Sequence, residues 1–379
     1  MFFSISPVPH SNFSLHWQTG TVCIDTDNGW ESQEHGDQLF IYKGYTDQGR
    51  LDQQLLSVSS QTLGNFCIIA VNKLKQKIRI VADRYRSFPI YFENGHGANN
   101  LERLDMTAWT DSVLELDFDL NITEHKVDVI GHIDTLPLTY QSAIDQVHTI
   151  LTNKTQQFLN NNTLPLKVFL SGGVDTLLVY SYLVAAGAEF ELVDYNHLEH
   201  DYFWRSNNHL ITRNWGYSQI HHWKQPCVLA SGAPGDEFML RSPTTANLFL
   251  RRNNTSIPQL LDQFPECLHY SYFNLAKHQK IFQEQQPTDQ DTSDWALCNM
   301  LVNDWQHWHL GNTLTWTPLR DLEIIKILLR MPLTTAISQI MDSEFSKQLI
   351  ERNTPGATQF LSDQKNTGPA LKNLNLLFS

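Results

Sequence analysis

The segment VFLSGGVDTLLVYSYL (168–183) decides the fold of the second half of this chain. An apolar run stops at Gly172 and Gly173, and a stretch with helical apolar spacing begins at Asp175. A second strand-like run, FELVDYN, follows at 190–196. We therefore predict a strand, a glycine turn, a helix and a second strand, the unit from which open parallel sheets are built.

The glycine turn predicts an anion site, because ligands of parallel sheets bind at the carboxyl ends of strands and beside helix N-termini. The backbone N–H groups and the helix dipole would favour a phosphate, and Ser171 would add a hydroxyl hydrogen bond. Asp175 would repel an anion unless a cation lay between them, so the pattern also predicts Mg²⁺. We expect the turn to lie at the surface. The alternative interpretation is a turn with Asp175 and Thr176 at the helix start that binds nothing.

A second glycine-rich turn follows another apolar run, in VLASGAPGDEFMLRSP (228–243). If the strand CVLA (227–230) lies in the same sheet, both turns open onto the same edge. Asp236 would then share Mg²⁺ with Asp175, and Glu237 would face the reacting group. The alternative is that Asp236 and Glu237 form an ordinary solvated acidic pair.

The first ~118 residues predict an antiparallel, sheet-rich domain. Short runs rich in β-branched and aromatic residues, separated by turn residues, occur at 39–42, 65–71, 77–82 and 89–92. Beyond them we predict a short helix with its N-cap at Thr123. The remainder after 196 is expected to be largely helical, with apolar helical spacing in LEIIKILLRM (322–331).

Composition limits the functional classes. The chain has 379 residues, enough for two domains of about 100–200 residues, and its net charge of −13 argues against binding to nucleic-acid phosphates. No apolar run reaches the ~18 residues of a membrane span, and the N-terminal residues lack a signal-peptide pattern. The five cysteines fit neither a disulfide framework nor a CxxC metal site, so we expect free thiols in the cytoplasm.

Five segments together resemble the asparagine synthetase superfamily. LSGGVDT (170–176) is similar to its pyrophosphatase-loop signature, and SGAPGDE (231–237) to its second signature. The segment 315–332 resembles the family's R-x-P-F-L-D helix, 346–368 resembles its C-terminal stretch with a lysine, and 64–92 is similar to the core of class II glutamine amidotransferase domains. The order of these segments matches the family's domain order.

This resemblance implies a fold of two domains. Residues 1–118 would form an α+β, antiparallel sheet-rich domain of the Ntn-hydrolase type, similar to a glutamine amidotransferase. Residues 119–379 would form an α/β parallel-sheet PP-loop domain, similar to adenine nucleotide α-hydrolases, with a helical C-terminal part.

The resemblance also implies an activity, in which ATP is split to AMP and pyrophosphate while a carboxylate is adenylated and passed to an amine. Lys365 and Glu237 would be catalytic, and Asp175 and Asp236 would bind Mg²⁺. The residues that would bind ATP are Leu170, Ser171, Gly172, Gly173, Val174, Asp175, Thr176 and Gly232.

The chain departs from the family pattern in both halves. Phe2 stands where class II glutaminases have a cysteine nucleophile, and Lys43 stands at the place of the glutamine-binding Asn. We therefore expect no glutaminase activity, as in the β-lactam synthetases and the lasso peptide macrolactam synthetases. In the second signature Ala233 and Pro234 replace Asp-Gly, and Arg320 replaces an apolar residue before an aspartate.

Several alternatives stay open. The substrates are expected to be a carboxylate and an amine, as small molecules or peptides, with no nucleic acid and no membrane as partner, and a homodimer is left open. A non-catalytic relative that binds nucleotide and acts as a regulator or partner is the main alternative to a ligase. A nucleobase- or RNA-modifying enzyme with the same loop is a third hypothesis, which the negative charge argues against.

Overall fold

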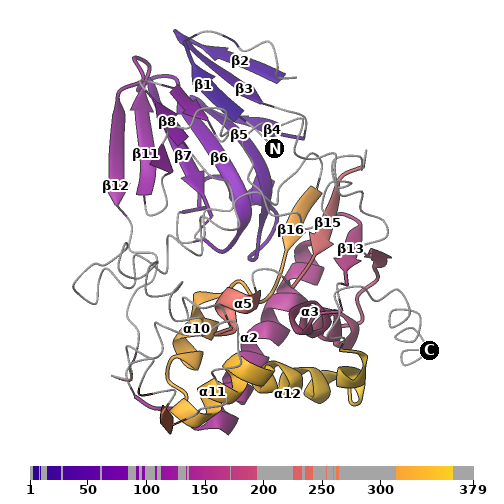
Figure 1. Cartoon of the computed structure of the whole chain (residues 1–379). Helices are drawn as coiled ribbons and strands as arrows, with labels where there is room; N and C mark the ends of the chain where they lie inside the picture. The colour runs from indigo at the N-terminus through magenta and orange to yellow at the C-terminus, as the bar shows by residue number, and fades with distance from the viewer. Residues whose placement is uncertain are drawn as a thin grey trace, which may run out of the picture.

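A computed structural model places two sheet-containing regions along the chain (Figure 1). The structure describes residues 3–7, 9, 15–26, 29–59, 62–83, 91–93, 96–98, 107–108, 112–126, 134, 136–170, 172–193, 225–232, 235–241, 253, 259, 262–263 and 313–361. All structural statements below concern these residues.

The N-terminal region consists of antiparallel strands in two sheets. The first sheet has the spatial order β10 (Thr107–Ala108), β8 (Tyr91–Glu93), β9 (His96–Ala98), β1 (Phe3–Ser6), β3 (Val22–Thr26) and β2 (Leu15–Thr19). The second has the order β12 (Ile122–Lys126), β11 (Ser112–Asp117), β7 (Lys77–Ala82), β6 (Gly64–Asn72), β5 (Gln38–Thr46) and β4 (Glu31–His35). The predicted strands at 39–42, 65–71 and 77–82 are confirmed, and the fourth is described from Tyr91 onward.

Strand β5 shows why these runs are almost continuously apolar. Leu39 and Ile41 belong to the main core, whereas Phe40 and Tyr42 belong to a second buried cluster with Leu51 of α1 (Leu51–Gln54). Successive side chains of a strand point to opposite faces, so this strand is buried on both faces.

The helix predicted to begin at Thr123 is wrong, because 122–126 form β12, which pairs with β11. Ile122 and Thr123 are β-branched and suit an extended chain. The connection is a tight turn in which the Asp117 carboxylate accepts hydrogen bonds from the backbone N–H groups of Asp119 and Asn121, each at 2.9 Å. The antiparallel sheet thus runs past residue 118, the boundary expected from the sequence.

The second region is built on a parallel sheet with the order β14 (Glu191–Val193), β13 (Leu166–Phe169), β15 (Cys227–Ala230) and β16 (Thr313–Trp316). The predicted unit is confirmed: β13 leads through the glycine turn into α3 (Val174–Ala185) and then to β14. The strand CVLA lies directly beside β13, so the two glycine turns follow adjacent strands of one sheet.

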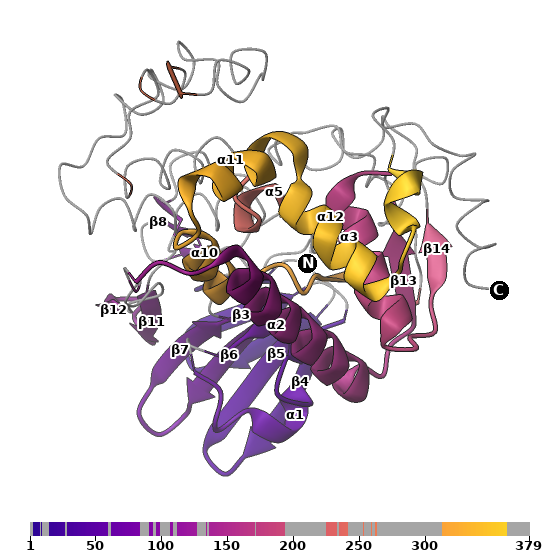
Figure 2. The ribbon, with the colours of Figure 1, turned by 90° about the horizontal axis from the view of Figure 1, so that it is seen from below.

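Helices of this region pack on one another beside the sheet (Figure 1). They are α2 (Tyr140–Asn161), α3, α5 (Gly235–Phe238), α10 (Leu322–Leu328), α11 (Leu333–Asp342), α12 (Glu344–Asn353) and the 3₁₀ helix η5 (Ala357–Phe360). Seen from below, α2 runs between the sheet of β4–β7 and the helices α3 and α12 (Figure 2). Thr139 caps α2 by accepting a hydrogen bond from the N–H of Ser142 at 3.2 Å.

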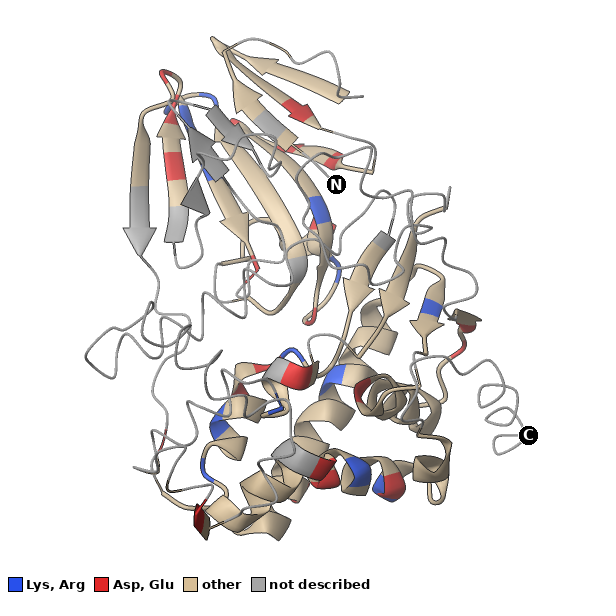
Figure 3. Cartoon of the chain, viewed as in Figure 1, with Lys and Arg blue, Asp and Glu red and all other residues tan. Residues whose placement is uncertain are grey.

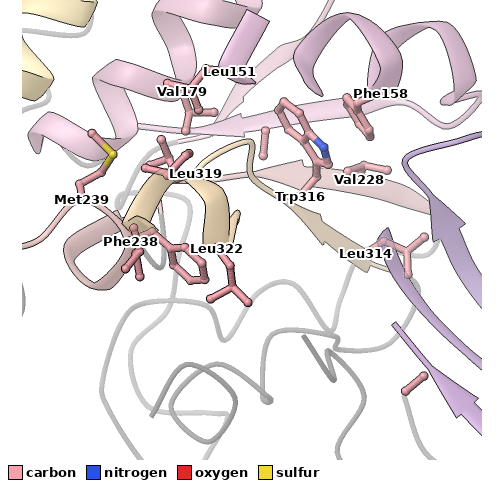
Figure 4. Close-up of a cluster of buried hydrophobic side chains, with 14 of the residues drawn as sticks. Leu151, Phe158, Val179, Val228, Phe238, Met239, Leu314, Trp316, Leu319 and Leu322 are labelled. Carbon is pink, nitrogen blue, oxygen red and sulfur yellow. The ribbon is translucent and has the colours of Figure 1, made fainter. Parts of the chain in front are cut away.

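Aromatic contacts join the two regions. The ring of Phe158 on α2 stacks on Trp316 of β16 at a centroid distance of 4.1 Å, and Tyr45 of β5 lies 5.7 Å from Phe158. The Tyr45 hydroxyl also donates a hydrogen bond to the Thr315 carbonyl at 2.8 Å. Figure 4 shows Phe158 and Trp316 beside Val228 in this core. The antiparallel and parallel sheets therefore share one continuous hydrophobic core.

Charged residues of both signs are interspersed over the helices of the second region (Figure 3). Examples are the exposed pairs Arg352–Asp145 at 2.5 Å and Lys326–Glu323 at 2.9 Å. Cys23, Cys67 and Cys227 are buried, as expected. None of the helices in the described part of the chain combines the length and the apolar character that a membrane span requires.

Candidate functional site

The turn after β13 leads into α3. Among the described residues, no side chain caps the start of this helix. Gly172 has φ +78°, a conformation that favours glycine, and Gly173 is the N-cap residue of α3. The backbone N–H groups of the first helical turn thus face the carboxyl edge of the sheet. The hydroxyl proton of Thr176 is used within the turn, in a hydrogen bond to the Gly173 carbonyl at 2.9 Å.

The turn after β15 packs directly against this helix start. A Cβ atom at position 232 would lie 2.4 Å from both the carbonyl carbon of Asp175 and the amide nitrogen of Thr176. A Cβ atom at Gly235 would lie 2.4 Å from Asp175 Cγ. Both positions require glycine because non-bonded carbon atoms need about 3.5–4.0 Å. The two turns therefore form one unit, with Asp175 held between two glycines.

A guanidinium connects the acidic residues of the two turns. Arg241 lies 2.6 Å from Asp175 Oδ1 through one terminal nitrogen and 2.8 Å from Asp236 Oδ1 through the other. The expected proximity of the two aspartates is thereby confirmed in the geometry, and Arg241 is a cation that contacts both of them. We name these three residues the Asp–Arg–Asp cluster.

The turn was expected at the surface, and Gly173 is indeed exposed, but Asp175 is largely covered. Its side chain is only 16% exposed, because Gly235 packs on its carboxyl group and Arg241 covers it. The pKa of Asp175 is raised overall, because burial, the largest cause, and the neighbouring charge of Asp236 raise it more than Arg241 lowers it. Asp236 is more accessible, at 42% exposure.

Buried residues fix the backbone that carries Arg241. Leu240 is fully buried and adopts φ +61°, a conformation that costs a residue with a side chain about 1–2 kcal/mol. The buried amide of Gln339 on α11 donates hydrogen bonds to the Met239 carbonyl at 2.8 Å and to Ser346 Oγ at 3.0 Å. The side chain of Arg241 therefore begins from a backbone whose position the core determines.

The donor set of the cluster fits a divalent cation in type. Asp175 and Asp236 turn carboxylate oxygens toward one point, and carboxylate oxygens are the ligands that Mg²⁺ takes. The guanidinium of Arg241 stands at that point as a cation. Within the described residues, no group of three or more His, Cys, Asp or Glu side chains is arranged to hold a metal. A metal here would use the two aspartates together with oxygens from water or a phosphate.

A second ion cluster joins the two regions. The ammonium of Lys154 on α2 lies 3.2 Å from Asp321 Oδ2 and 3.5 Å from Asp47 Oδ2, and it donates to the Arg320 carbonyl at 3.2 Å. Burial lowers the pKa of Lys154, but the carboxylates of Asp321 and Asp47 raise it more, so the net shift is upward. Asp321 also caps α10 by accepting from the N–H of Glu323 at 2.9 Å.

The other predicted site residues divide into three groups. Leu170 and Val174 are buried and support the turn. Glu237 lies in α5 beside Asp236, but its side chain is not described. Ser171 and Lys365, together with Ala233 and Pro234, fall outside the described residues.

Sequence reasoning missed Gly235, Arg241 and Lys154. Gly235 stands in the second signature but had no stated role, and its need for glycine follows only from the contact with Asp175. Arg241 follows Asp236 in the same quoted segment, and an arginine so close to an acidic pair could have indicated an ion pair. Lys154 carried no signal beyond one basic residue at a position of α2 that the apolar spacing places toward the core.

A groove of about 780 Å³ lies away from both turns. Its lining comes from α2 and α10 with the preceding and following loops, and includes Thr139, Asp145, Glu323, Lys326 and Arg330. It contains none of the residues of the Asp–Arg–Asp cluster.

No protein-family model matches this chain, and a search of curated protein sequences finds no match either.

Proposed function

We propose that the chain is an ATP-dependent, AMP-forming amide ligase of the asparagine synthetase type that works without glutaminase activity. The antiparallel region would be a glutamine amidotransferase-like domain of the Ntn-hydrolase type. The parallel-sheet region would be a PP-loop domain similar to adenine nucleotide α-hydrolases.

One observation carries this proposal. Two glycine turns at the carboxyl ends of adjacent parallel strands meet at the start of α3, with Asp175 packed between Gly232 and Gly235. Such an edge brings the N–H groups at the start of α3, a close backbone approach and paired carboxylates to one point, which suits a polyphosphate with its counter-ion.

In the proposed reaction, a substrate carboxylate attacks the α-phosphorus of ATP and the bond to the β-phosphate breaks, so that pyrophosphate leaves. An amine then attacks the acyl carbon, the bond to AMP breaks, and the amine nitrogen loses a proton. The N–H groups at the start of α3 would bind the departing pyrophosphate, with Gly172 and Gly173 allowing it to come close.

Asp175 and Asp236 would hold Mg²⁺, which when bound neutralises phosphate charge. Lys365 would stabilise charge on the phosphates and then on the acyl centre as the amine adds. Glu237 would orient the amine or accept its proton. These last two roles rest on the sequence resemblance alone.

Pyrophosphate release tests this function. The protein with Mg-ATP and a panel of carboxylates and amines should release pyrophosphate and AMP in equal amounts when both substrates are present. Asp175→Asn keeps the packing against Gly235 but removes the charge, and should reduce the rate by roughly 10²-fold. Asp145→Asn, which removes a surface carboxylate paired with Arg352, is the matched control and should keep the full rate.

A nucleotide-binding regulator without catalysis is the second candidate. The Asp–Arg–Asp cluster favours it, because Arg241 already pairs with both carboxylates that would hold the metal. Calorimetric ATP binding without pyrophosphate release across the whole panel would support the regulator. No ATP binding, with and without Mg²⁺, would exclude both candidates.

We also expect that glutamine is not hydrolysed. Lys43, at the proposed glutamine-binding position, is buried in β5. Burial and the charge of Asp25 raise the pKa of the Cys23 thiol, which makes it a poor nucleophile at neutral pH. Incubation with glutamine should release no glutamate above the level of heat-denatured protein. Release that thiol alkylation abolishes would show that a cysteine acts as nucleophile.

A further inference from the structure

We propose that Arg241 is a built-in counter-ion that excludes divalent metal from Asp175 and Asp236 until a polyphosphate draws its guanidinium away. Metal binding to this pair would then be coupled to nucleotide binding. The exclusion of metal rests on the Asp–Arg–Asp cluster itself, whereas the coupling to nucleotide rests on the proposed function.

The geometry makes metal and arginine mutually exclusive. The two terminal nitrogens of Arg241 lie 2.6 and 2.8 Å from one oxygen of each aspartate. Mg²⁺ binds carboxylate oxygens at about 2.0–2.1 Å and keeps a full shell of oxygen ligands. A guanidinium that spans both carboxylates occupies the space between them, so the metal can use both aspartates only after Arg241 moves.

The charges of the Asp–Arg–Asp cluster explain why a nucleotide would draw the Arg241 guanidinium away. With both acids ionised, the cluster carries a net charge of −1, and adding Mg²⁺ beside Arg241 would place two cations together. A polyphosphate offers the guanidinium new oxygen partners of the kind that arginine binds in a bidentate manner. The start of α3, where such an anion would lie, is next to Asp175 in sequence and in space.

A backbone conformation and a hydrogen bond next to Arg241 indicate that its position is built into the fold. Leu240 holds a left-handed backbone conformation immediately before it, and the Gln339 amide fixes the Met239 carbonyl just upstream. The Arg241 side chain is itself only 14% exposed. An arginine held in this way differs from a surface arginine such as Arg352, which is 41% exposed.

Binding of Mn²⁺ as a probe, followed by electron paramagnetic resonance without nucleotide, tests the exclusion. Wild-type protein should bind Mn²⁺ weakly, and Arg241→Gln should bind it at least about 10-fold more tightly, the factor expected when one competing charge-assisted ion pair is removed. Arg352→Gln, which removes an arginine from another aspartate, should behave as wild type. Adding Asp236→Asn to Arg241→Gln should abolish the gain.

A second variant guards against a folding defect. Arg241→Lys keeps a positive charge but replaces the planar fork by a point charge, so it should give an intermediate Mn²⁺ affinity. Equal Mn²⁺ affinity of the wild type, Arg241→Gln and Arg241→Lys, with all three folded, would overturn the proposal.

Titrations with ATP distinguish a failure of this inference from a failure of the proposed function. ATP without metal should bind Arg241→Gln several-fold more weakly than the wild type, because the guanidinium no longer contacts the phosphates. If Mn²⁺ affinity rises in Arg241→Gln while neither protein binds ATP, the counter-ion role stands and the proposed function fails. If ATP binds both proteins equally, with or without Mn²⁺, the coupling is overturned.

Discussion

Replacing Lys154 with Met is expected to lower the free energy of unfolding by about 3–5 kcal/mol. The substitution keeps a similar apolar stem but removes the ammonium between Asp47 and Asp321, which are both buried. Two uncompensated carboxylates would then face each other where the antiparallel region meets α2 and α10. Urea denaturation of the wild type and the variant at pH 7 measures the difference.

A matched variant, in which a lysine is removed from an exposed carboxylate, distinguishes the effect of burying an ion pair from the effect of the ion pair alone. Lys326→Met removes a lysine from Glu323, which is 52% exposed, and should cost about 0.5 kcal/mol or less. Adding Asp47→Asn and Asp321→Asn to Lys154→Met should restore most of the stability, because neutral amides no longer need the cation and Asn is an equally good helix cap. A loss in Lys154→Met no larger than in Lys326→Met would contradict the buried role of this cluster.

The direction of the Lys154 pKa shift fixes the pH window of this contribution. The folded pKa lies above the ordinary value of 10.5, so the stabilisation is fully present below that value. It is lost only as the pH rises through the folded pKa. The effect of Lys154→Met should therefore be undiminished at pH 7 to 9.

Gly232→Ala is expected to have the second-largest effect. The added Cβ would lie 2.4 Å from backbone atoms of Asp175 and Thr176, so the second turn must move away from the start of α3. Such overpacking costs about 1–3 kcal/mol, and this position should lie at the upper end because the obstacle is backbone. If the proposed function holds, ATP affinity should also fall at least about 10-fold, since the two turns no longer form one unit.

Gly187→Ala provides the control for this substitution at the other end of α3. Gly187 has φ +71°, but a Cβ there would meet no atom within 4 Å. Its cost should be about 1 kcal/mol from backbone strain alone, with ATP affinity unchanged. Thermal unfolding and calorimetric titration measure both quantities. Equal stability of the wild type and Gly232→Ala would mean that the two turns are not packed as described.

The local pattern was sufficient to predict the parallel unit. The run before Gly172, the turn and the helix behind Asp175 lie within one continuous segment, and their apolar spacing and glycines act over a few residues. The same holds for β5, β6 and β7. The prediction failed at Thr123, because a β-branched residue near a turn favours a strand only once β11 is available as its partner.

The sequence by itself determined that glycine turns follow two buried strands and that acidic residues stand in both turns. Only the tertiary structure decided what those acidic residues contact. Arg241 and Asp175 are 66 residues apart, and Lys154 and Asp321 are 167 apart. No periodicity reports such pairs, because an ion pair depends on where two segments come to lie once the core has packed. The order of the strands placed the turns side by side, and the close contact of Gly232 and Gly235 with Asp175 then covered most of its carboxylate, although the turn itself was expected at the surface.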